Sequence, residues 1–150
     1  MDELKAALKV LLADTFVMYF KTHTYHWNVE GMFFTEYHKF FGGLYEELHE
    51  SIDDIAEHIR ACADDYAPMS LMEMYNYKTL SEDSTKPANV TEMLNNLIAA
   101  NNVIIADLDK VFQLGEAVNN QGLLEFISGR LDTHHKHAWM LKASAKNTGA

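Results

Sequence analysis

Residues 26–57, HWNVEGMFFTEYHKFFGGLYEELHESIDDIAE, contain the end of one helical pattern, a short turn and most of a second helical pattern. In the second pattern, apolar residues recur every three or four positions, as expected for one buried face of a helix. The glycine at position 31 separates the two patterns. This stretch therefore predicts two long helices joined by a tight turn. The recurring apolar residues are Phe41, Leu44, Leu48, Ile52, Ile55 and, just beyond the stretch, Ile59.

The same reasoning extends to both sides of this hairpin. Upstream, Leu4, Leu8 and Leu11 share one helix face, so a first helix is expected over about residues 3–29. The second helix is expected over about 34–63, with no clear cap at its start. Both long segments lack proline, which would interrupt a helix.

Residues 64–88 form an irregular connection that contains both prolines, Pro68 and Pro87. Two capping boxes lie in or next to it. Ser70-x-x-Glu73 predicts a short helix through about Tyr77, and Asn89-x-x-Glu92 opens a third long helix. We expect Gly115 to close that third helix, and a fourth helix to follow Asn119-Asn120.

Two helical hairpins joined by a long connection predict an all-α fold: a ferritin-like four-helix bundle with a short extra helix in the connection. No run of strand-like alternation and no internal repeat is found in the sequence. The length of 150 residues favours one domain spanning residues 1–150.

Composition narrows the function classes. The formal net charge of −10 repels the phosphate backbone, so direct binding to nucleic acid is not expected. The one cysteine, Cys62, excludes an internal disulfide framework and fits a reducing compartment. The first residues show no basic segment followed by an apolar run, and no apolar stretch is long enough to cross a membrane. We therefore expect a cytoplasmic protein.

Four residues form a candidate metal site: His26, His38, Asp53 and Glu57. Two imidazoles and two carboxylates suit ferrous iron or another first-row metal ion. At about 1.5 Å of rise per residue, the two carboxylates lie roughly 22 to 28 Å along the helix from His38. One chain cannot wrap all four side chains around one ion, so a second subunit must supply half of the site.

Each member of this set also has a simpler interpretation. The two carboxylates are four residues apart and would form an ordinary solvated helix face, with Arg60 available as an ion-pair partner for Glu57. Either histidine alone is more often packed than a ligand. A conventional single-chain di-iron site needs two Glu-x-x-His motifs, and only Glu46-x-x-His49 is present, so these two residues are expected at the surface.

The order and spacing of residues 23–57 closely resemble those of the Dps mini-ferritins, the DNA-binding proteins from starved cells. The resemblance covers nearly the whole chain and includes the segment Lys136–Leu141. The matching motifs are His23-x-x-His26-Trp27-Asn28-Val29-x-Gly31-x-x-Phe34-x-x-x-His38 and Asp53-x-x-Ala56-Glu57.

This resemblance implies a hollow homo-dodecamer that oxidises ferrous iron with hydrogen peroxide, or with oxygen, and stores ferric mineral. His26 and His38 would come from one subunit, and Asp53 and Glu57 from its two-fold partner. Trp27 would be an electron donor beside the site, with interface packing as its alternative role. The residues near the region of the family's iron-conducting pores are Glu116, Gln121 and Glu125.

Two departures from the family pattern bear on function. Four residues after His38, where the family often carries an acid, this chain has Gly42-Gly43, so one metal ligand or its support is missing. Many family members bind DNA through a lysine-rich extension, whereas the C-terminal segment Leu141–Ala150 contains only Lys142 and Lys146, so DNA binding is not an expectation that carries over. The alternative function is therefore a non-enzymatic, cage-forming relative with an impaired iron site that acts by assembly or DNA co-condensation.

A cluster of polar residues near the C-terminus has two interpretations. It could bind a metal ion, but an exposed or interface cluster is the expected one. Its members are Asp132, His134, His135 and His137.

Overall fold

A computed structural model describes residues 1–146 of the chain. Residues 147–150, which include the end of the lysine-poor C-terminal segment and of the predicted domain, lie outside this range. No strand occurs within 1–146, and no helix there is long and apolar enough to cross a membrane. The helices are α1 (Asp2–Asn28), α2 (Phe34–Ala63), α3 (Leu71–Tyr77), α4 (Val90–Ala117) and α5 (Gln121–Ala145).

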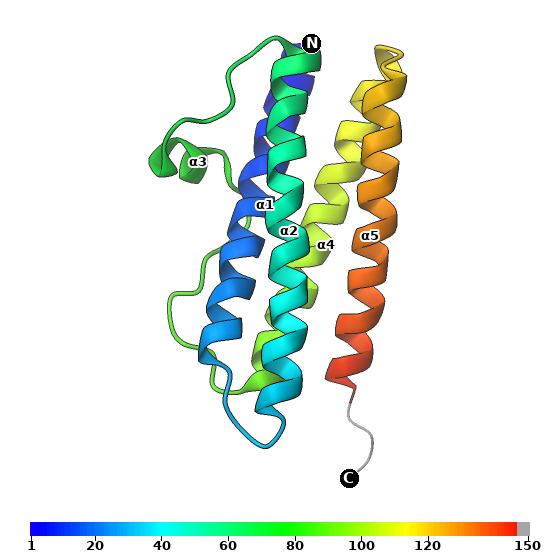
Figure 1. Ribbon diagram of the computed structural model, residues 1–150. Helices are drawn as coiled ribbons and strands as arrows, with labels where there is room; N and C mark the ends of the chain where they lie inside the picture. Colours follow the sequence, from blue (N-terminus) through cyan, green and yellow to red (C-terminus); the bar gives the residue numbers. More distant parts are fainter. Residues whose placement is uncertain (147–150) are drawn as a thin grey trace.

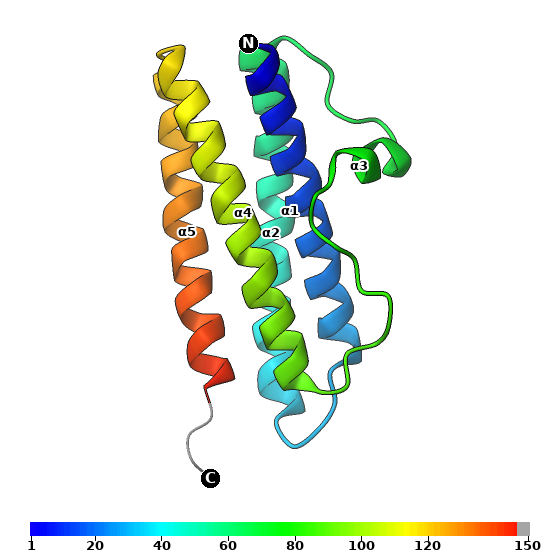
Figure 2. The ribbon, with the colours of Figure 1, turned by 180° about the vertical axis from the view of Figure 1, so that it is seen from behind.

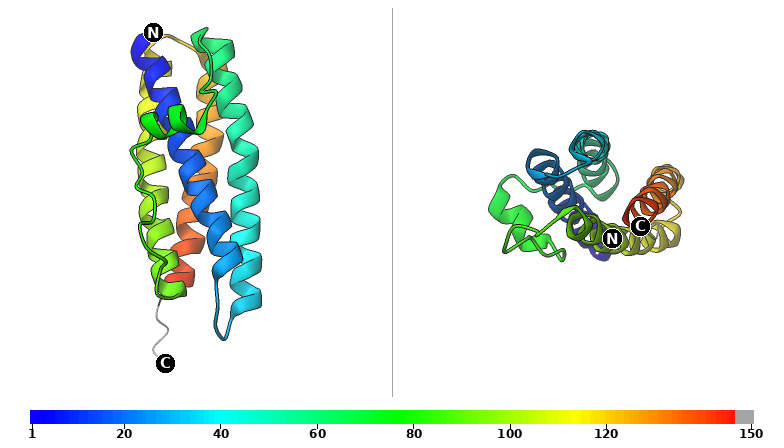
Figure 3. Two further views of the ribbon diagram at one scale, coloured as in Figure 1. Left: turned by 90° about the vertical axis from the view of Figure 1, so that its left-hand side faces the viewer. Right: turned by 90° about the horizontal axis from the view of Figure 1, so that it is seen from below.

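The four long helices form two antiparallel hairpins that lie side by side (Figures 1 and 2). One hairpin is α1 with α2 and the other is α4 with α5, and the main contact between them is α1 against α4. The connection between α2 and α4 runs along the outside of α1 and carries α3 (Figure 3). The ferritin-like four-helix bundle with one long crossover is thereby confirmed.

The core is built from the aliphatic faces that the sequence periodicity predicts. These side chains are almost completely buried because each helix turns the same face inward every three or four residues. The fully buried set includes Leu8, Leu11, Leu12, Leu48, Ile59, Leu97, Ile104, Leu108, Ile127 and Leu141.

Both predicted capping boxes are present. The Ser70 side chain accepts a hydrogen bond from the backbone N–H of Glu73, and the Asn89 side chain accepts one from that of Glu92. Each glutamate carboxylate reaches back to the backbone N–H of the residue just before the cap. These bonds satisfy N–H groups that a helix start otherwise leaves unpaired. The start of α2 has no side-chain cap, as expected.

The prediction that Gly115 closes the third long helix is wrong. The helix continues to Ala117, and the chain then turns at Asn119, whose φ of 55° is left-handed. Gly115 is buried, and a Cβ there would lie 3.1 Å from the Leu123 side chain of α5. The glycine permits close packing of α4 against α5 and does not mark the helix end.

The crossover is held against α1 by buried acceptors and charges. Asp14 of α1 accepts hydrogen bonds from the backbone N–H and the hydroxyl of Thr79 and from the N–H of Leu80. Lys21 forms an ion pair with Asp83, with a separation of 2.7 Å. Because both anchors lie on α1, they hold the crossover against the outer face of α1. The crossover therefore leaves α2 uncovered.

Candidate metal centre

The turn between α1 and α2 brings His26 and His38 together. His26 lies in the last turn of α1 and His38 in the second turn of α2. The chain reverses in five residues, and Gly31, with a φ of 117°, occupies a conformation that side-chain-bearing residues rarely adopt. The two imidazole rings stack with their centres 3.8 Å apart. The turn therefore places these two rings in contact within one chain.

The two histidines hold each other in the tautomer that a metal ion needs. His26 Nδ1 lies 2.6 Å from the carbonyl oxygen of His38, and His38 Nδ1 lies 2.7 Å from that of His26. A carbonyl oxygen can only accept, so both Nδ1 atoms carry the proton. With Nδ1 donating in each ring, Nε2 is the nitrogen that can offer a lone pair to a metal ion. Such carbonyl bonds orient the imidazoles of metal sites.

Gly42 gives the His26 ring the space that this arrangement requires. A Cβ at position 42 would lie 3.2 Å from both Cε1 and Nδ1 of His26. A side chain there would press on the atom that donates to the His38 carbonyl. Position 42, where the family often carries an acid, is therefore a place where α2 packs closely against the His26 ring in this chain. By contrast, a Cβ at Gly43 would meet nothing within 4 Å.

The predicted carboxylate ligands lie elsewhere on the same chain. Asp53 and Glu57 are exposed on α2, and they follow His38 by 15 and 19 residues along one continuous helix. No group of three or more His, Cys, Asp or Glu residues within 1–146 is close enough to hold a metal ion. Arg60, the alternative partner for Glu57, instead donates to the carbonyl oxygen of Asp65. The carboxylate pair is therefore free to meet another molecule.

Aromatic residues surround the histidine pair on one side. His23 stacks on Tyr45, with ring centres 3.8 Å apart, and its Nδ1 lies 3.0 Å from the hydroxyl of Tyr19. Burial and the neighbouring His26 lower the pKa of His23. Trp27 is 54% exposed and its ring centre lies 4.3 Å from that of His23. Trp27 therefore packs against His23, whose ring centre lies 6.2 Å from that of His26.

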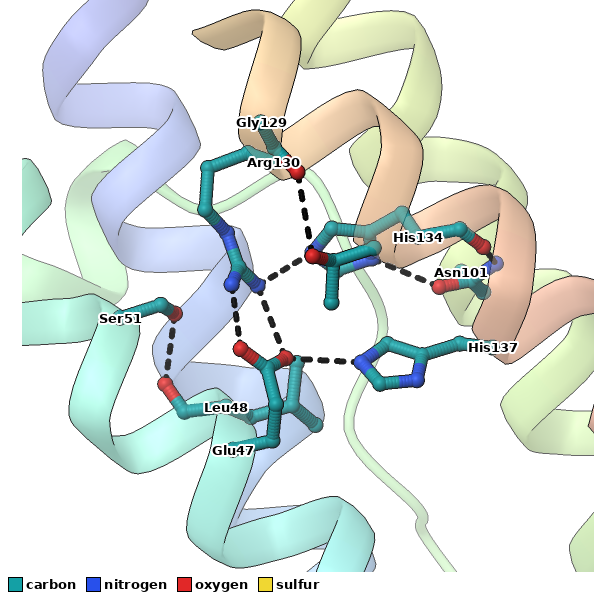
Figure 4. Close-up of polar contacts among 9 residues, drawn as sticks. Glu47, Leu48, Ser51, Asn101, Gly129, Arg130, His134 and His137 are labelled. Carbon is teal, nitrogen blue, oxygen red and sulfur yellow. Dashed lines mark hydrogen bonds and ion pairs between the residues drawn. The ribbon is translucent and has the colours of Figure 1, made fainter. Parts of the chain in front are cut away.

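The C-terminal cluster, predicted to be exposed or at an interface, is divided: His134 and His137 face inward and the other two members are exposed. His134 is buried: its Nδ1 donates to the Asn101 side chain of α4, and its Nε2 accepts from Arg130 (Figure 4). His137 is bonded to Glu47 of α2 at 2.7 Å, and Arg130 holds the same carboxylate through both of its terminal nitrogens. The signal in the sequence is the spacing of Arg130, His134 and His137, which places all three on one face of α5.

This cluster is a link between α2 and α5. Burial alone would raise the pKa of Glu47, but hydrogen bonds from His137 and Arg130 and the charge of Arg130 lower it to about 2. Burial, followed by the charge of Arg130, lowers the pKa of His134. Asp132 and His135 are exposed. The inward-facing members are hydrogen-bonded to one another, and within 1–146 they form no group of three or more residues that could hold a metal ion.

The remaining candidates lie at the surface. Glu46 and His49 are exposed, as expected, and the His49 ring packs 4.9 Å from that of Tyr19. The three pore candidates are also exposed and flank the turn between α4 and α5: Glu116, Gln121 and Glu125.

Comparisons with known proteins bear on the family of this chain. A model of the ferritin-like domain matches residues 5–149. A low temperature-induced protein of Nostoc sp. is 34% identical, over 88% of this chain and 74% of its own. DNA protection during starvation protein 2 of Bacillus anthracis is 28% identical, over 93% of this chain and 96% of its own.

A solved structure leads to the same assignment. The Dps protein of Vibrio cholerae O1, described as a member of a broad superfamily of ferritin-like diiron-carboxylate proteins, has a TM-score of 0.90. It is 26% identical, with 97% of this chain and 90% of that chain covered. The bundle, the short helix in the crossover and these matches together show that this chain belongs to the Dps family of ferritin-like proteins.

Proposed function

We propose that this protein oxidises ferrous iron with hydrogen peroxide or oxygen and stores the ferric product inside a homo-dodecameric cage. His26 and His38 of one subunit and Asp53 and Glu57 of its two-fold partner would form each oxidation site. The activity protects against oxidative damage, because it consumes peroxide and ferrous iron together. We place it in the cytoplasm, in agreement with the single cysteine, Cys62.

The reciprocal hydrogen bonds of His26 and His38 carry this proposal. They hold two Nε2 lone pairs in place before any metal ion binds, and so reduce the cost of ordering the site. Histidine pairs that serve only packing do not need both rings in this tautomer. The carboxylates add hard oxygen donors, which favour ferric over ferrous iron.

The need for a second subunit follows from the rigidity of α2. The helix separates its own histidine from its own carboxylates by roughly 22 to 28 Å, and no bend brings them together. A two-fold axis is isologous, so one contact between the histidine end and the partner's carboxylate segment is repeated by symmetry. Two identical sites then form at each such interface.

Exposed apolar residues support interfaces on this protein. The turn between α1 and α2 presents large apolar side chains to solvent, and a second group lies at α3, away from that turn (Figure 1). Clusters of this kind mark surfaces that are covered in the assembled protein. The turn residues are Trp27, Met32, Phe33 and Phe34, and those near α3 are Met69, Leu71, Met72 and Tyr75.

In this proposal ferrous iron is the substrate. Two ferrous ions supply two electrons to one hydrogen peroxide, which takes two protons and yields two waters and two ferric ions. The exposed residues around the turn between α4 and α5 would line the entry route. These are Glu116, Gln121 and Glu125.

Gly42 favours the second candidate function, a cage-forming relative with an impaired site. The position offers no carboxylate, so the donor set is smaller than the family often has. This protein would then assemble normally and act by assembly or DNA co-condensation. Stoichiometric ferrous oxidation, measured with peroxide and with oxygen, separates the two functions.

A complementation experiment tests the shared site. One variant carries His26→Ala and His38→Ala, and the other carries Asp53→Ala and Glu57→Ala. Each should assemble but oxidise iron poorly. Unfolded and reassembled together, they form mixed pairs in which one site is intact and the other has no ligands. With random pairing the mixture should recover about a quarter of the wild-type rate.

Asp54→Ala is the matched control, since Asp54 is an exposed neighbour that lies off the shared face of Asp53 and Glu57. It should keep the full rate. Native mass spectrometry must show dodecamers in every sample. Well-assembled mixed cages without any recovered activity would show that the two halves of the site do not meet, and a stable monomer at micromolar concentration would exclude the shared site.

A further inference from the structure

One aromatic side chain near the histidine pair is equipped to lose a proton and an electron together. The Tyr19 hydroxyl lies 3.0 Å from Nδ1 of His23, four residues along α1. A phenol is hard to oxidise while it keeps its proton, because the radical cation is a very strong acid. A tyrosine with a hydrogen-bonded base is therefore a far better electron donor than one without.

The surrounding rings connect this pair to the metal ligands. The Tyr19 and His23 ring centres are 5.6 Å apart, and His23 stacks face to face on Tyr45 at 3.8 Å. Tyr45 in turn lies 5.2 Å from the ring of His26, and His23 lies 6.2 Å from it. No step in this chain of rings is longer than 6.2 Å, so an electron can cross it through packed side chains.

We propose that Tyr19 supplies an electron to the iron site, with His23 accepting its proton, whenever a single ferrous ion is bound there. This inference rests on the proposed function. The need for such a donor arises because peroxide takes two electrons while one ferrous ion supplies one. The absence of a carboxylate at Gly42 makes a singly occupied site the relevant case for this chain.

The step balances as follows. The ferrous ion becomes ferric and gives one electron. Tyr19 gives the second electron, becomes a neutral phenoxyl radical and passes its proton to Nδ1 of His23. The O–O bond of hydrogen peroxide breaks, and with two protons from solvent it yields two waters. Without the donor, the same ferrous ion would release hydroxide and a hydroxyl radical.

The test uses assembled wild-type cages and three variants, each loaded anaerobically with one ferrous ion per site and mixed with hydrogen peroxide. Rapid freezing and electron paramagnetic resonance detect the radical, and ferric absorbance is read in the same samples. The variants are Tyr19→Phe, Tyr45→Phe and Trp27→Phe. Tyr45→Phe is the matched control, because it also removes one hydroxyl from a tyrosine whose ring packs on His23.

Wild type should show a tyrosyl signal that falls to the iron-free background in Tyr19→Phe and persists in the other two variants. Trapped hydroxyl radical should rise in Tyr19→Phe alone. An unchanged signal in Tyr19→Phe, or a signal lost only in Trp27→Phe or Tyr45→Phe, would overturn the assignment. Ferric iron without any organic radical in wild type would refute this inference alone, whereas no ferric iron would refute the proposed function with it.

Discussion

Replacing Glu47 by glutamine should destabilise the bundle by about 2 kcal/mol at neutral pH. Glu47 is the α2 partner of two groups on α5, the buried guanidinium of Arg130 and the imidazole of His137. Lowering the pKa of this carboxyl from 4.5 to about 2 corresponds to about 3 kcal/mol. Because 32% of the side chain stays exposed, solvent screening reduces the value.

The effect should depend on pH in a defined direction. The folded-state pKa of Glu47 is depressed, so its contribution is complete above the ordinary range near 4.5 and is lost as the pH falls towards 2. The glutamine variant has no such carboxylate. The difference in stability between wild type and variant should therefore be largest at pH 7 and should shrink at pH 3.

Thermal unfolding followed by circular dichroism measures this difference at pH 7, 5 and 3. For a chain of this length, about 2 kcal/mol corresponds to a decrease in Tm of roughly 6 °C. Glu46→Gln is the matched control, since Glu46 is the exposed neighbour on the same helix, and it should leave the Tm nearly unchanged. Native mass spectrometry at each pH ensures that equal assemblies are compared.

The reasoning would be refuted if Glu47→Gln lowered the Tm no more than Glu46→Gln at pH 7. It would also be refuted if the decrease were as large at pH 3 as at pH 7. Either result would mean that the link between α2 and α5 is held by packing rather than by the charged carboxylate.

Three further results are expected. Gly42→Ala should slow ferrous oxidation in a stopped-flow assay, because the added Cβ presses on His26. Gly43→Ala brings the same gain in helix propensity, about 1 kcal/mol, but should not slow the reaction. Equal rates for the two variants would contradict this. Burial and the neighbouring Asp14 raise the pKa of Asp107, so the stability of the wild type should fall as the pH rises above about 4. Asp107→Asn should flatten the plot of Tm against pH. Parallel plots for wild type and variant would argue against this. Duplex DNA should not be retained in a gel shift at physiological salt, given the net charge of −10, and tight retention without divalent cations would reveal a local basic surface.

Local patterns in the sequence were enough to predict the helices and their order. Helix formation depends on neighbours three and four residues apart, and capping depends on side chains within one turn, as at Ser70 and Asn89. The rise per residue is also a local constant. It was therefore possible to conclude that one copy of α2 cannot bring His38 and Glu57 to one metal ion.

Contacts between distant segments required the folded chain. Gly115 looked like a helix end because glycine is common there, but its role depends on Leu123 of the next helix. The cluster that includes His134 was predicted to be exposed or at an interface, yet His134 is buried within the chain between Asn101 and Arg130. The contact between Gly42 and His26 follows from how α1 crosses α2. Residue spacing specifies which side chains share one face of a helix. The packing angle and the distance between helices specify which residues of other helices that face contacts.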